Sequence, residues 1–147
     1  MPPLYLLHPV AVHFAIALLV IGALFKALSE WKKAGLADTV SLWLLRIACP
    51  AAIVTASLGL LAAKTAPHVP PAWETMYDHK ILVLCTAGAS IALWIIEELA
   101  HRQPKPWLTW LSRLLWLTVL ILVVVTGDAG GDLVYQYGVA VATAPHI

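Results

Sequence analysis

The sequence predicts an all-α integral membrane protein built as a four-helix bundle, and three observations support that prediction. Of the 147 residues, 61% are hydrophobic and only 12% are charged, whereas a soluble domain is about 45–50% apolar and about 25% charged. Four apolar stretches are each long enough to cross the hydrocarbon core of a bilayer, which takes about 20 residues. The other residues form short connections, so residues 1–147 are predicted to be a single transmembrane domain.

The predicted spans cover residues 9–28, 41–64, 76–99 and 108–127. The first starts with Pro9, which is tolerated at a helix N-terminus because no backbone donor is needed there. The third follows a stretch, Thr75 to Asp78, that fits the capping pattern S/T-x-x-D/E. After the fourth span, residues 126–141 contain a Gly130-Gly131 pair typical of a turn. This stretch predicts a short amphipathic segment lying on the outer face of the bundle.

The basic residues predict how the bundle is oriented. Lys64 and Lys80 alone flank the second connection, whereas seven of the nine lysines and arginines surround the first and third: Lys26, Lys32, Lys33, Arg46, Arg102, Lys105 and Arg113. Positive charge favours the cytoplasmic side, so both termini are expected outside a bacterial inner membrane. A net charge of only +1 and the lack of a basic cluster argue against nucleic-acid binding.

Two histidines stand out inside the spans. His13 and His79 each lie about four residues, or roughly 6 Å, inside a predicted helix, so they reach a matching depth. Ionisable groups within a span are costly and are functional by default. The pair fits axial ligation of a haem iron from both sides. A role with a non-haem metal or a quinone, and a hydrogen-bonded structural pair, remain open.

His8 is a third candidate. It lies five residues before His13, which is about 140° around a helix, so both rings cannot point at the bundle axis. His8 is expected to cap the helix, contact a haem propionate or serve a second site.

The helix faces around these histidines are built from small residues. One stripe in the second span would let a flat macrocycle approach the backbone, although close helix packing is the slightly better explanation of the stripe taken alone. The stripe consists of Ala52, Thr55, Ala56, Gly59 and Ala63.

In the C-terminal stretch, Tyr135 and Tyr137 are expected to form hydrogen bonds with haem propionates, to cap the site, or to anchor the chain at the membrane interface.

The two ends of the chain carry a resemblance. The start HPVAVHFAIAL and the end GGDLVYQYGVAV resemble the HPxxVHFPIAL and GGxLVYxxGVGV motifs of a bacterial family of small four-helix predicted membrane proteins. That family is described as a domain of unknown function and as cytochrome b-like. The resemblance implies haem b bound through His8, His13 and His79 or a subset of them. Asp128 and Tyr137 stand where some members carry histidine. If those histidines hold a second haem in the other members, this chain is expected to have lost it.

The expected function is therefore that of a membrane electron-transfer protein or subunit. It would hold haem b near the periplasmic face and exchange electrons with the quinone pool or with other membrane or periplasmic redox proteins. The alternatives are a non-redox accessory subunit of a larger membrane complex and a membrane protein that binds a non-haem metal. Without a hydrolase or P-loop motif, an enzyme acting alone is not expected.

Overall fold

The computed structural model describes residues 4–66 and 68–140, which form four long helices. Within that part of the chain there are no strands, so the predicted all-α class is confirmed. Each long helix contains one predicted span and extends beyond it at both ends. The elements are η1 (Leu4–Leu6), α1 (Leu7–Lys32), α2 (Gly35–Thr65), η2 (Pro70–Ala72), α3 (Trp73–Arg102) and α4 (Pro106–Tyr135), where η is a 3-10 helix.

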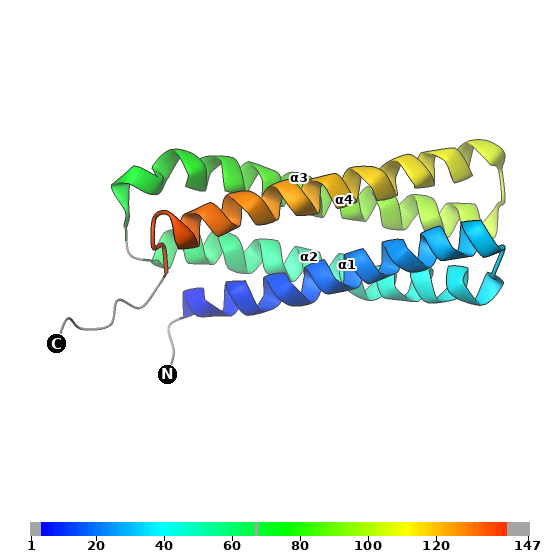
Figure 1. The fold of residues 1–147 in the computed structure, drawn as a ribbon, viewed down its shortest axis with the longest axis horizontal. Helices are drawn as coiled ribbons and strands as arrows, with labels where there is room; N and C mark the ends of the chain where they lie inside the picture. Colours follow the sequence, from blue (N-terminus) through cyan, green and yellow to red (C-terminus); the bar gives the residue numbers. More distant parts are fainter. Residues whose placement is uncertain (1–3, 67, 141–147) are drawn as a thin grey trace.

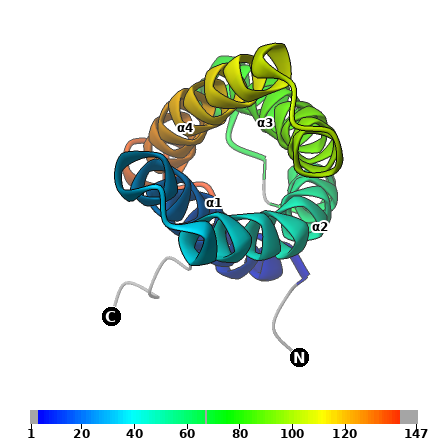
Figure 2. The same cartoon turned by 90° about the vertical axis from the view of Figure 1, so that its right-hand side faces the viewer.

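The helices alternate in direction, and the start of α1 and the end of α4 lie at the same end of the bundle (Figure 1). We call this the terminal end, and the end that carries the turns 33–34 and 103–105 the opposite end. Viewed along the bundle, the four helices follow one another around a ring, so that α1 lies diagonally across from α3 (Figure 2). The helix α1 packs extensively on α2, and α3 on α4, whereas α1 and α4 contact each other sparingly. The fold is thus two helical hairpins packed together.

Short connections hold each hairpin closed at the opposite end. Lys33 adopts left-handed backbone angles, with φ of 50°, and ends α1, as helix C-termini commonly do. Pro106 occupies the start of α4, where its fixed φ suits the first helical turn.

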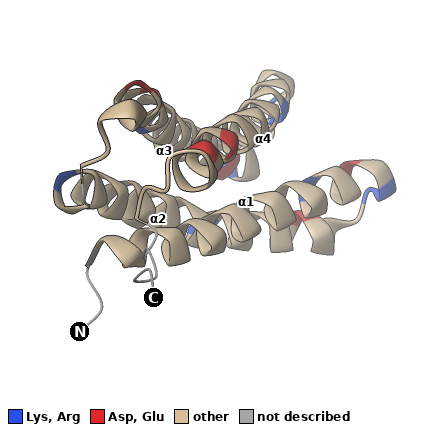
Figure 3. Ribbon diagram, turned by 60° about the vertical axis from the view of Figure 1, so that its left-hand side comes forward, with Lys and Arg blue, Asp and Glu red and all other residues tan. Residues whose placement is uncertain are grey.

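The core and the outside of the bundle are both apolar. Leu19, Leu45, Leu93 and Val119, one from each helix, are fully buried and belong to one hydrophobic cluster. Yet only 22% to 33% of the most apolar window of each helix is buried inside the protein. The charged residues are largely confined to the two ends (Figure 3). An apolar exterior between charged ends is what a bilayer requires, and the prediction of four membrane-spanning helices is confirmed.

The predicted start of the third helix is wrong. The helix begins at Trp73, two residues before Thr75, and its N-cap residue makes no side-chain hydrogen bond. The 3-10 turn of Pro70–Ala72 leads directly into it, so the chain already has helical direction before the expected capping sequence begins.

The predicted turn at Gly130 and Gly131 is also wrong, because α4 continues through both glycines to Tyr135. The chain reverses only beyond that point, where Gly138 has a φ of +64° and Val139 packs against Leu133. The expected segment on the outer face is therefore reduced to this reversal, and its last residue, Val141, lies outside the described residues.

Candidate cofactor site

Two histidines face each other at the terminal end. His8, near the start of α1, and His79, near the start of α3, have ring centroids 6.4 Å apart and ring planes inclined by 72°. They come from α1 and α3, which lie diagonally across from each other in the ring of helices (Figure 2), so the pair spans the interior of the bundle. The structure therefore pairs His79 with His8, and not with His13 as the sequence led us to expect.

His13 lies at the edge of the same site. Its side chain is exposed, and its Nδ1–H donates to the carbonyl of Pro9 one turn earlier at 2.6 Å. It lines the cavity described below, whereas the ring that pairs with His79 is that of His8. The offset of about 140° around α1 does separate the two rings, and the ring that turns inward is His8. Ligation by His13 stays a prediction.

Each inward histidine rests on a glycine of the neighbouring helix. A Cβ at Gly59 of α2 would lie 2.8 Å from Cε1 of His8, and a Cβ at Gly130 of α4 would lie 3.0 Å from Cε1 of His79. The first distance is shorter than real Cβ contacts and the second is tighter than most of them, so a side chain at either position would force the imidazole to shift. Gly130 lies within the continuous helix α4, and its lack of a side chain leaves room for the imidazole of His79.

The hydrogen bonds of the two rings leave nitrogens available. The Nδ1–H of His8 donates to the carbonyl of Thr55 at 3.1 Å; because a carbonyl only accepts, Nε2 of His8 keeps its lone pair. This is the usual arrangement of a metal-ligating histidine. On the other side, Nδ1 of His79 is buried and lacks a hydrogen-bond partner within the described structure.

A cavity of about 480 Å³ surrounds the pair, within the size range of cofactor sites, about 300–1,000 Å³. All four helices line it, mostly with apolar and small side chains, and the predicted small-residue stripe of α2 lines it throughout. Tyr135 reaches its mouth but is 90% exposed. Asp128 and Tyr137 do not line it.

The two hairpins repeat one arrangement, which the sequence analysis missed. His8, Thr55 and Gly59 each have an identical residue 71 positions later, namely His79, Thr126 and Gly130. The same spacing separates Ser41 from Ser112. It also maps nearly the whole length of α2 onto α4. Internal repeats with a site at their interface are common in membrane proteins. Comparing the sequence with itself at fixed spacings would have found this signal, and it would have paired His79 with His8.

The two histidines are not part of a larger group of potential metal ligands among the described residues. In the described ranges 4–66 and 68–140, no three or more His, Cys, Asp or Glu side chains are grouped to hold a metal. A structural zinc site uses four protein ligands. A porphyrin brings its own four nitrogens and takes one axial ligand from each side.

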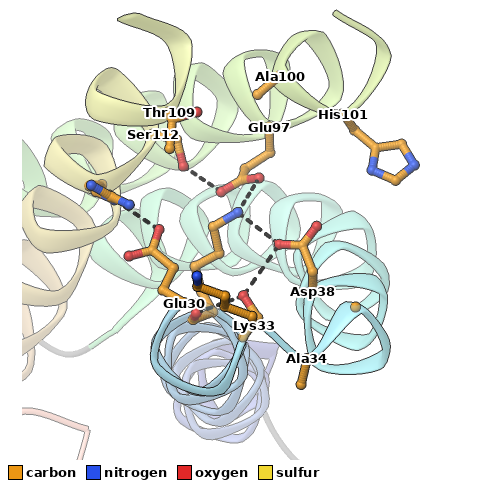
Figure 4. A pocket seen from close by; sticks show the side chains of 13 residues that line it. Glu30, Lys33, Ala34, Asp38, Glu97, Ala100, His101, Thr109 and Ser112 are labelled. Atoms are coloured by element: carbon orange, nitrogen blue, oxygen red, sulfur yellow. Dashed lines mark hydrogen bonds and ion pairs between the residues drawn. The ribbon is translucent and has the colours of Figure 1, made fainter. Parts of the chain in front are cut away.

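A second polar cluster lies at the opposite end of the bundle (Figure 4). Lys26 reaches between Asp38 and Glu97, with Nζ 3.0 Å from an oxygen of each. Glu97 is only 6% exposed, and its other oxygen accepts from Ser112 and from the indole N–H of Trp116 at 2.7 Å. A pocket of about 350 Å³ opens beside these groups.

This polar cluster is separate from the histidine site. Lys26 lies 18 residues beyond His8 on α1, or about 27 Å along the helix, and the apolar core lies between them. From the sequence, Lys26 contributed only to the predicted orientation, and Asp38 and Glu97 were not recognised as its partners. Lys26 and Glu97 are themselves 71 residues apart, so they hold corresponding places in the two hairpins and join them.

Replacing Gly59 or Gly130 with alanine is expected to destabilise the bundle, because the new methyl group would collide with an imidazole. Such overpacking costs about 1–3 kcal/mol. The measurement is the free energy of unfolding, followed by loss of helicity in detergent micelles. Gly88→Ala is the control: nothing lies within 4 Å of its Cβ position, so it should be neutral or stabilising by up to about 1 kcal/mol. Equal effects of all three substitutions would contradict the packing described here.

Comparison with known proteins places the chain in a family. No curated protein and no solved structure is similar enough to match. Residues 5–143 match the family described as "Predicted membrane protein (DUF2231)", and this range includes both histidines, both glycines and all four spans. The chain therefore belongs to the DUF2231 family of predicted membrane proteins.

Proposed function

We propose that this protein is a membrane electron-transfer protein, or a subunit of one, that binds haem b with His8 and His79 as the axial ligands. The observation that carries the proposal is the pair of imidazoles facing each other across the bundle with ring centroids 6.4 Å apart. Two imidazoles on one metal with bonds of about 2.0 Å would have ring centres about 6 Å apart.

The same distance argues against a quinone held between both rings. Two hydrogen bonds of about 2.8 Å from the imidazoles would alone take up about 5.6 Å, before any space for the quinone ring. The small and apolar lining of the cavity suits a flat macrocycle that must pass close to the helix backbones.

The residues of the chain have defined tasks in this proposal. The carbonyl of Thr55 holds the proton of His8 on Nδ1 and so presents Nε2 to the iron. Gly59 and Gly130 have no side chains and so leave space for the rings of His8 and His79. The apolar lining keeps water out, and burial of this kind tunes a reduction potential. Bound haem would supply reversible one-electron transfer.

We place the terminal end, with the histidine site, on the periplasmic side of a bacterial inner membrane, because the positive charges gather at the opposite end. The redox partners would be the quinone pool or other membrane or periplasmic redox proteins. A non-redox accessory subunit and a non-haem metal protein are the alternatives that the following experiment distinguishes.

The test is the visible spectrum of the full chain, expressed with ample haem supply and purified in detergent. The reduced-minus-oxidised difference should show the bands of a low-spin b-type haem at about one haem per chain. Fully helical protein that is colourless, and stays so after haem is added, would contradict the proposal. A colourless protein that retains zinc or copper through the histidines would instead support the non-haem metal alternative.

A further inference from the structure

The lining of the histidine cavity holds a single formal charge. Among the residues that form it, Lys80 carries the one ammonium, and none is an aspartate or a glutamate. A lone cation in an apolar lining favours a ligand that brings negative charge of its own.

Lys80 is half-buried and directly follows His79 on α3. Within the described residues no carboxylate lies within 4.0 Å of its Nζ; the ion pairs found there are made by Lys26, Arg46, Arg102 and Arg113. The charge of Lys80 is thus not already neutralised by the part of the chain that surrounds the cavity.

The other lysine of the terminal end behaves differently. Lys64, near the end of α2, is exposed and does not line the cavity, as expected of a lysine that places its charge in the membrane interface. Lys80 also has no counterpart in the first hairpin, where the corresponding residue is Pro9. Each hairpin thus contributes one histidine to the site, but only the second hairpin contributes a positively charged residue to the lining.

We propose that Lys80 binds a carboxylate of the ligand and so sets which edge of a flat, carboxylate-bearing macrocycle faces the α3 side of the cavity. This inference rests on the proposed function and names the ligand class more closely: an anionic porphyrin, with its acidic groups on one edge. An ammonium–carboxylate contact of this kind is a charge-assisted hydrogen bond.

The test compares ligands that differ from haem either in their carboxylates or in their iron. Haem, its dimethyl ester and iron-free protoporphyrin are titrated into the purified full chain, with binding followed by absorbance and by fluorescence quenching. Lys80→Met should weaken binding of haem and of iron-free protoporphyrin by about tenfold and leave the ester unchanged. Lys80→Arg should retain wild-type affinity, and Lys64→Met, the matched control, should change none of the three.

The outcomes separate this inference from the proposed function. Equal binding of acid and ester by the wild type, or an unchanged affinity for both acids in Lys80→Met, would overturn the role of Lys80. If Lys80→Met weakens the iron-free dicarboxylate while His8→Ala and His79→Ala leave haem binding intact, the role of Lys80 stands and axial ligation is wrong. Weakened ester binding in Lys80→Met would show a general effect on the cavity and would also overturn it.

Discussion

Replacing either His8 or His79 with alanine is expected to abolish the low-spin b-type spectrum. Each substitution removes one of the two imidazoles whose ring centroids lie 6.4 Å apart, so the proposed haem would keep only one histidine ligand. Haem affinity should fall by more than about 100-fold. Losing a residue that only hydrogen-bonds to a metal ligand already costs up to about 100-fold, and losing the ligand itself should cost more. The measurements are haem content per chain and the reduced-minus-oxidised spectrum.

His13→Ala is the matched control for these variants. His13 lies on the same helix and at the edge of the same cavity, but its ring is exposed and bonded to its own helix. The variant should keep the low-spin spectrum. Loss of that spectrum in His13→Ala, with full retention in His8→Ala, would restore the pairing of His13 with His79 that the sequence favoured.

The second large effect is expected at the opposite end of the bundle. Glu97→Leu leaves the ammonium of Lys26 with Asp38 alone and leaves the indole N–H of Trp116 without an acceptor. Breaking a buried ion pair by removing one partner costs about 3–5 kcal/mol. The unfolding free energy in detergent should fall by that amount, while the site about 27 Å away keeps its spectrum in the fraction that stays folded.

An exposed ion pair of the same end serves as the comparison. Arg113 pairs with Glu30 at 3.0 Å, and its side chain is 41% exposed. Removing its charge with Arg113→Met should cost about 0–1 kcal/mol, as is usual for surface pairs. A Glu97→Leu variant as stable as Arg113→Met would show that the buried cluster does not hold the hairpins together.

Most of the fold followed from the sequence, because a bilayer leaves few solutions. Four apolar stretches with short connections permit only a helical bundle, since every backbone group inside hydrocarbon must be paired within its own helix. The helix ends were less predictable. Thr75 was expected to cap α3 and Gly130 to start a turn, yet α3 begins at Trp73, directly after a 3-10 turn, and α4 continues through Gly130 to Tyr135.

The site was predicted in part. The sequence identified His8, His13 and His79 and the small-residue stripe of α2 as candidates, and the structure brings all of them around one cavity. The sequence did not determine whether His8 or His13 of α1 turns into the bundle. That depends on how α1 is rotated against α2, and the close fit of His8 against Gly59 is a tertiary contact.

The sequence by itself therefore determined that the chain spans a membrane with four helices and that it carries histidines within its spans, because composition and periodicity are local properties of the chain. Only the tertiary structure decided that His8 meets His79, that Lys26 meets Glu97, and that Gly130 lies against His79. Each of these pairs joins residues far apart in sequence, and their contact depends on helix rotation and on the packing of side chains against neighbouring helices.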